Sequence, residues 1–334
     1  MRREQKPSIH RILAAVKDLR AASMPAVLKG AQLARALRCP LRLFHGIEEP
    51  IYMDMAQSDA RPVAQIKRER YESCSKRLEA IAARLRRRGI DVTTAVEWDF
   101  PAYEAILRNA KEFRADLIVA ECHATRHRAP WLLRFTDWEL LRMSAVPVLL
   151  VKSRKPYHRP RVLAAVDPTH AFAKPTNLDA QILRHGSTVS AALGGALHAV
   201  HAYDPIPIDM MTAMPSSAGA VAKIETRITA RAEHALESIL KVTPIPAQRR
   251  HLIGRHPLDA IAEAAAATHS TILVMGAVAR SGLKRVFIGN TAEKLLDRLP
   301  CDFLIVKPRR FPSHVRTARR GPQLVTLPVI QPGL

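Results

Sequence analysis

Short apolar runs alternate with longer amphipathic stretches along the whole chain. In the second half, runs of aliphatic and β-branched residues predict strands at Arg161–Val166, Ala196–His201, Gln248–Ile253, Ile272–Met275 and Phe303–Val306. Between them, apolar residues recur with helical spacing over Leu178–Leu193, Val221–Val242, Pro257–Thr268 and Thr291–Leu299. Short apolar strands that alternate with helices predict a parallel sheet covered by helices on both faces.

The same order of segments occurs twice in the sequence. RILAAVKD at Arg11–Asp18 matches RVLAAVDP at Arg161–Pro168, and LLRMSAVPVLLVK at Leu140–Lys152 matches LLDRLPCDFLIVK at Leu295–Lys307 without a gap. Self-similarity at an offset of about 155 residues indicates that one structural unit has been duplicated.

The repeat predicts two tandem Rossmann-like α/β domains, each with a five-stranded parallel sheet, at residues 1–155 and 156–310. A short linker rich in proline and charge joins them near Lys152–Pro160. Residues 311–334 repeat neither unit and carry arginines without acids, so we expect a basic, disordered tail there.

Composition limits the class of protein. The chain has 334 residues, with 52 Lys and Arg against 30 Asp and Glu, for a formal net charge of +22. No apolar run reaches the roughly 18 residues of a transmembrane helix, which predicts a cytoplasmic protein with no transmembrane insertion. The four cysteines form no C-x-x-C pair, so neither a disulfide framework nor a metal site is expected.

Basic charge leaves one alternative function open. The excess is spread along the chain, and no RNA-binding or helix-turn-helix signature accompanies it. Specific nucleic-acid recognition is therefore not expected, whereas weak association with RNA or an anionic surface remains an alternative.

The segment after the fourth strand of the second half has features of an anion-binding loop. Gly276 would let the backbone approach a phosphate, and Arg280 and Ser281 would bind its oxygens. Gly289 and Asn290 then lead into a helix whose free N–H groups favour an anion.

This loop resembles the nucleotide loop of the universal stress protein family, G-x-x-G-x(9)-G-[ST]. The spacing from Gly276 to Gly289 is kept, while Ala279 replaces the second glycine and Asn290 the Ser/Thr. Together with WDFPAYEAI at Trp98–Ile106 and FTDWELLR at Phe135–Arg142, the repeat is similar to the tandem E-type members. The resemblance implies the adenine nucleotide alpha hydrolase-like form of the Rossmann-like fold and a role in the stress response.

The resemblance also implies a nucleotide site in the second half. An acid at the end of the first strand would take the ribose, the backbone after the second strand would meet adenine, and the loop would hold phosphates. The cofactor-binding residues so predicted are Ala165, Val166, Asp167, Ala202, Met275, Gly276, Ala279, Arg280, Ser281, Gly289, Asn290 and Thr291. The expected ligand is ATP with Mg, in the second domain alone. The alternative is an inherited loop that binds nothing.

The first half departs from the pattern. The alignment places Lys17 at the position of Asp167 and Glu121 at that of Gly276. We therefore expect a degenerate domain that has lost the site.

A second candidate pocket is apolar: the segments Ile47–Met55 and Tyr203–Met214 would either line a site for a hydrophobic molecule or cover the sheet ends.

The sequence predicts a non-enzymatic protein that binds a small-molecule ligand. It has no nucleophile elbow, zinc-protease motif or Walker lysine, so no catalytic residue is assigned, and slow ATP hydrolysis is the enzyme alternative. The halves are expected to form an intramolecular pseudo-dimer through the strands Pro147–Val151 and Phe303–Val306. A homodimer could form on top of it.

Overall fold

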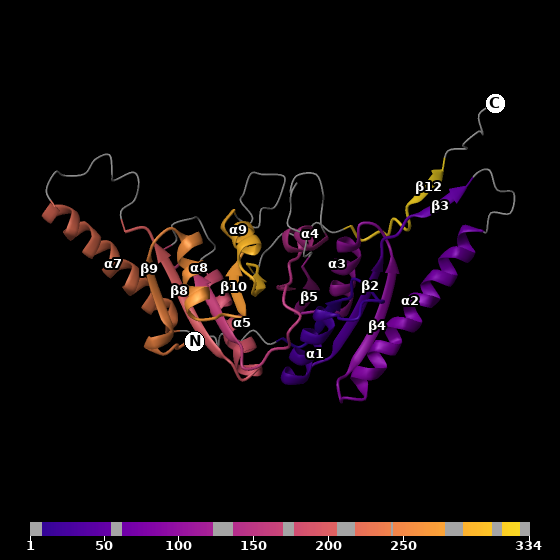
Figure 1. Ribbon diagram of the computed structural model, residues 1–334, viewed down its shortest axis with the longest axis horizontal. Helices are drawn as coiled ribbons and strands as arrows, with labels where there is room; N and C mark the ends of the chain where they lie inside the picture. The colour runs from indigo at the N-terminus through magenta and orange to yellow at the C-terminus, as the bar shows by residue number, and fades with distance from the viewer. Residues whose placement is uncertain are drawn as a thin grey trace, which may run out of the picture. The chain divides into compact units, whose positions relative to one another are not determined.

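The computed structural model describes residues 9–54, 62–122, 136–169, 177–205, 218–241, 243–277, 290–308 and 316–327 (Figure 1). The chain divides into two compact units. The first-half unit contains His10–Ser144 together with Ser313–Leu334, and the second-half unit contains Ala145–Pro312 together with Met1–Ile9.

The second-half unit is built on one sheet. Its strands are β6 (Val148–Val151), β7 (Arg161–Val166), β8 (Ala196–Tyr203), β9 (Arg250–Gly254), β10 (Ile272–Gly276) and β11 (Asp302–Val306). They lie in the order β6-β11-β10-β7-β8-β9, and all neighbours are parallel except β6 and β11. The helices are α5 (Leu178–Ala192), α7 (Ala218–Leu240), α8 (Pro257–Ala267) and α9 (Asn290–Arg298), with a 3-10 turn at Ala247–Arg249.

The first-half unit has the same plan. Its strands β1 (Ile12–Ala15), β2 (Leu41–Ile47), β4 (Val92–Trp98) and β5 (Leu117–Glu121) form a parallel sheet in the order β4-β2-β1-β5. Its helices are α1 (Pro25–Leu37), α2 (Val63–Arg86), α3 (Ala102–Phe113) and α4 (Thr136–Met143). All four residues of β1 are buried, as expected for a central strand covered on both faces. The predicted α/β fold is confirmed. The described residues give four strands in this sheet and six in the second-half sheet, where five parallel strands were expected in each.

Strand β6 follows the first half in sequence but belongs to the second-half unit. It pairs antiparallel with β11, so that Val148 lies opposite Ile305 and Leu150 opposite Phe303. All four residues of β6 are buried. The predicted pairing of these two strands is confirmed, and it moves the boundary between the compact units to Ser144, before the end of the sequence repeat at 155.

The prediction of a disordered tail over 311–334 is wrong for residues 316–327. These residues lie on the first-half unit, where β12 (Leu324–Leu327) forms a two-stranded parallel sheet with β3 (Ile51–Asp54). The backbone N–H groups of Arg320 and Gly321 both donate to the buried carboxylate of Asp99. This segment is therefore ordered by Asp99, an acid that lies more than two hundred residues earlier in the sequence.

Several compositional expectations can be checked within the described residues. No helix there is long and apolar enough to cross a membrane, and no three His, Cys, Asp or Glu side chains gather as they would around a metal ion. Cys39, Cys74 and Cys301 are buried free thiols. Burial raises the pKa of Cys39 to about 11 and that of Cys301 to about 12, so both stay protonated and unreactive at neutral pH.

Candidate functional site

In the second-half unit, the strands β10, β7 and β8 are neighbours and run parallel, so their carboxyl ends meet at one edge of the sheet. Such an edge is where open α/β sheets bind ligands. The structure brings six predicted site residues to this edge: Ala165, Val166, Asp167, Ala202, Met275 and Gly276.

Asp167 is held in place by two hydrogen bonds at the start of α5. Its backbone N–H donates to Oδ1 of Asp179 at 3.1 Å, and the hydroxyl of Thr169 donates to its own Oδ1 at 3.1 Å. Asp179 is buried in the first turn of α5, whereas Asp167 is partly exposed. The Asp167 carboxylate is thus partly exposed at the sheet edge, and the hydroxyl of Thr169 orients it.

Packing against α5 explains why residue 276 is glycine, which the loop pattern alone did not reveal. A Cβ at this position would lie 2.6 Å from Cδ2 and 2.9 Å from Cγ of Leu178, in the first turn of α5. No side-chain carbon fits at that distance, so close packing between β10 and α5 requires the glycine. A glycine here does not by itself indicate a bound phosphate.

Replacing Gly276 by alanine is expected to lower the free energy of unfolding by about 1–3 kcal/mol in the absence of any ligand, because Leu178 must move. The matched control is Gly219→Ala in α7, where an added Cβ meets nothing within 4 Å. That change should be neutral or stabilising by about 0.5–1 kcal/mol. Urea denaturation measures both. Equal stability of the two variants would contradict the packing explanation.

Most of the predicted phosphate-binding residues are not among those that the structure describes. Ala279, Arg280, Ser281 and Gly289 lie outside the described residues. Asn290 is the first residue of α9 and Thr291 the second, so both stand at a helix N-terminus as the sequence predicted. The N-terminus of α9 supplies backbone donors of the kind that bind anions.

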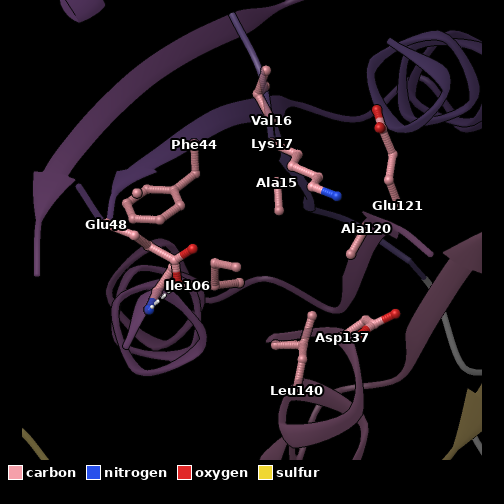
Figure 2. Close-up of a pocket in the computed structure, with 12 residues that line it drawn as sticks. Ala15, Val16, Lys17, Phe44, Glu48, Ile106, Ala120, Glu121, Asp137 and Leu140 are labelled. Carbon is pink, nitrogen blue, oxygen red and sulfur yellow. Dashed lines mark hydrogen bonds between the residues drawn. The ribbon is translucent and has the colours of Figure 1, made fainter. Parts of the chain in front are cut away.

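A small cavity of about 70 Å³ lies at the corresponding edge of the first-half unit (Figure 2). It is lined by Ala15, Val16, Lys17, Phe44, Gly46, Glu48, Ala102, Ile106, Ala120, Glu121, Asp137 and Leu140. These residues come from the ends of β1, β2 and β5 and from α3 and α4. In this half the sequence predicted only the apolar segment Ile47–Met55 as a candidate pocket wall, and that segment contributes Glu48 to the lining. The cavity at the strand ends was not predicted.

The carboxylates around this cavity already occupy helix N-termini. Glu48 Oε1 accepts the N–H of Ala102 in α3 at 2.8 Å, as Figure 2 shows, and Glu121 Oε1 accepts that of Ala26 in α1 at 3.4 Å. Asp137 lies in the first turn of α4 and accepts the N–H of Trp138 at 3.0 Å. The protein's own acids therefore take the donors that a phosphate would need.

A histidine on the second strand fulfils the same structural role in both halves. His45 Nδ1 lies 2.8 Å from the carbonyl oxygen of Val16, and His201 Nδ1 lies 3.3 Å from that of Val166. Burial lowers the pKa of His45, so its ring is neutral near pH 7. Both rings tie β2 or β8 to the end of the first strand of its unit. The aligned LRLFH and LHAVH segments were the sequence signal for this pair.

The gapless alignment compares the two edges residue by residue. Glu121 corresponds to Gly276 and Asp137 to Ala292, so the second half lacks two of the carboxylates that line the first-half cavity. At the end of the first strand the charges are reversed, with Lys17 in one unit and Asp167 in the other. The two edges therefore share a fold but differ in charge.

This fold defines a protein with two tandem Rossmann-like α/β units, and comparison with known proteins supplies the family. The sequence matches the universal stress protein family over residues 8–152 and again over residues 159–307. The chain therefore belongs to the universal stress protein family, and its resemblance to the tandem E-type members is confirmed.

Two curated relatives are similar over most of the chain. Universal stress protein E of Photorhabdus laumondii is 27% identical over 237 residues, which cover 69% of this chain and 74% of the relative. Universal stress protein E of Escherichia coli K12 is 26% identical over 230 residues, 68% of this chain and 72% of the relative.

Solved structures share the two-domain fold. A protein of unknown function from Pseudomonas aeruginosa PAO1 superposes with a TM-score of 0.70 at 23% identity, covering 91% of this chain and 94% of its own. A universal stress protein from Archaeoglobus fulgidus superposes with a TM-score of 0.62 at 17% identity, covering 91% of this chain and 99% of its own. At these identities the likeness concerns the fold.

Proposed function

We propose that this tandem universal stress protein is a non-enzymatic stress-response protein that binds one adenine nucleotide, ATP or a close relative, in its second half. The observation that carries the proposal is the difference between the two sheet edges. Carboxylates occupy helix N-termini around the first-half cavity, whereas Gly276 and Ala292 stand in place of two of them in the second half. At these two aligned positions the first edge presents a carboxylate to a polyanion and the second edge does not, while Asp179 and Glu293 stand in the first turns of α5 and α9.

The described residues of the second edge suit the parts of a nucleotide. Asp167 offers a partly exposed, oriented carboxylate to ribose hydroxyls. Ala202, near the end of β8, carries a small side chain at the position where the family resemblance places the base. The first turn of α9, with Thr291, directs backbone N–H groups toward a phosphate. The sequence of the loop before Asn290 adds Arg280 as a cation for the phosphates.

Calorimetric titration of the full chain with ATP and magnesium tests the proposal, and one nucleotide per chain is expected. Thr291→Asp, which adds a second carboxylate to Glu293 in the first turn of α9, should weaken binding about tenfold or more while leaving the helix intact, because an acid is favourable there. Lys294→Ala is the control, since it changes the net charge equally one turn further along α9. Equal weakening by both variants, or two sites per chain, would contradict this assignment.

The same titration separates binding from hydrolysis. A binding protein returns ATP intact after long incubation, whereas the slow-hydrolase alternative releases phosphate in proportion to protein concentration. Fixed ionic strength is needed because a chain of net charge +22 attracts any polyanion weakly. Binding that disappears at moderate salt and ignores Thr291→Asp would favour the alternative of general anion or RNA association.

A further inference from the structure

Three acidic side chains form a buried cluster at the end of β4 and the start of α3. Glu97 is 5%, Asp99 0% and Glu104 6% exposed, and Arg108 of α3 pairs with both Glu97 and Asp99. We call these four residues the acidic socket. Buried carboxylates are costly unless cations and N–H donors satisfy them, and the socket supplies one arginine for three acids.

Residues 316–327 provide the missing donors. The backbone N–H groups of Arg320 and Gly321 donate to Oδ1 of Asp99 at 2.8 and 2.9 Å. Because both donors are backbone N–H groups, Asp99 binds the segment through its backbone conformation and not through a particular side chain. Gly321 has φ +79°, and a Cβ there would meet nothing within 4 Å, so its backbone angle is what favours glycine.

Side chains of the same segment complete the charge balance. Arg320 Nη2 donates to Glu104 Oε1 at 2.7 Å, and Arg319 Nε lies 3.5 Å from Glu97 Oε2. Two arginines thus offset the two excess carboxylates of the socket. The second oxygen of Glu104 has no hydrogen-bond partner within the described residues, so the socket can accept a further donor.

Beyond the socket, the segment continues as an added strand. The N–H of Ile51 donates to the carbonyl of Gln323 at 2.8 Å, and β12 then pairs with β3 from Leu324 opposite Ile51 to Leu327 opposite Asp54. A two-stranded sheet is marginal by itself in water. Leu324 is 52% exposed, so little apolar burial supports the strand, and the socket must be its anchor.

We propose that the acidic socket is a peptide-recognition site for an extended Arg-Arg-Gly segment that continues as a strand on β3, and that the chain's own residues 316–327 are its exchangeable resident. The arginine side chains are largely at the surface, with 66% of Arg319 and 42% of Arg320 exposed. Ion pairs so close to solvent hold weakly enough to open. The released socket would accept the same segment supplied from another molecule.

The experiment uses the full chain with Arg319→Glu and Arg320→Glu, which disables the resident segment without touching the socket. A fluorescent peptide of residues 316–327 is titrated, and its anisotropy is followed. The substituted chain should bind it about tenfold more tightly than the natural chain, whose socket is filled. A peptide with glutamate in place of Arg319 and Arg320 is the control and should not bind.

A socket substitution then locates the binding. Glu104→Gln in the substituted chain should weaken peptide binding several-fold, and Gly321→Ala in the peptide should do the same because of its positive φ. Hydrogen exchange gives an independent reading: the Arg320 and Gly321 amides should be protected in the natural chain and exchange faster once both arginines are glutamate. Equal binding of the two peptides, binding that ignores Glu104→Gln, or unprotected amides in the natural chain would each overturn the proposal.

Discussion

Replacing Asp302 by alanine is expected to lower the free energy of unfolding by about 3–5 kcal/mol, a large part of the stability of an ordinary domain. Asp302 is fully buried at the start of β11. Its Oδ1 accepts the N–H groups of Lys152 and Ser153 at 2.8 and 3.0 Å, and its Oδ2 accepts the hydroxyl of Tyr157 at 2.5 Å. One carboxylate therefore fixes the segment that follows β6 against β11.

The cost is high because the change leaves several donors without an acceptor at once. Urea denaturation followed by circular dichroism gives the measurement. Tyr157→Phe is the matched control: it removes one of the three hydrogen bonds and should cost about 1 kcal/mol. If alanine at 302 cost no more than phenylalanine at 157, the backbone contacts to Lys152 and Ser153 would not be important for stability.

Replacing Lys307 by methionine is expected to abolish a rise in the free energy of unfolding between about pH 7 and pH 10.5. Lys307 is 3% exposed, and burial lowers its pKa from 10.5 to about 7. Between pH 7 and 10.5 the unfolded chain binds this proton more tightly than the folded chain. Stability should therefore rise with pH across this window, and the methionine variant should lose that rise.

Lys152, the aligned lysine of the first repeat, is the control. Its Nζ donates to the carbonyl oxygens of Leu296 and Leu299 at the end of α9, so Lys152→Met should lower stability at the same pH. Urea midpoints of both variants at pH 7, 8, 9 and 10 make the comparison. A Lys307→Met variant that keeps the pH dependence of the natural chain would show that Lys307 does not cause it.

The local pattern of apolar residues predicted most of the secondary structure, because buried strands are short apolar runs and helices show apolar residues at helical spacing. Arg161–Val166 was predicted residue for residue, and α5, α8 and α9 begin or end within a residue of expectation. The largest deviation is α7, which spans Ala218–Leu240 instead of Val221–Val242. Strand β9 starts at Arg250 instead of Gln248 because a 3-10 turn precedes it. Nothing in strand composition signals such a turn.

The tail and the first-half cavity could not be predicted in this way because both depend on residues distant in sequence. The composition of residues 311–334 indicates disorder, and a partner such as Asp99 becomes visible only in three dimensions. The cavity arises where β1, β2 and β5 end beside α3, and its shape is set by side chains such as Phe44 and Ile106. Gly276 shows the opposite error, since a motif glycine has a packing role with Leu178.

The return of residues 316–327 to the first-half unit has a consequence for synthesis on the ribosome. The second-half unit has every strand that the structure describes once β11 has emerged, but the first-half unit still lacks β12 and the two arginines, Arg319 and Arg320, that pair with the acidic socket. Domains usually mature from the N-terminus onward during translation. Here the N-terminal unit is completed last, and until then a growing polypeptide displays the three carboxylates Glu97, Asp99 and Glu104 to the surrounding cell.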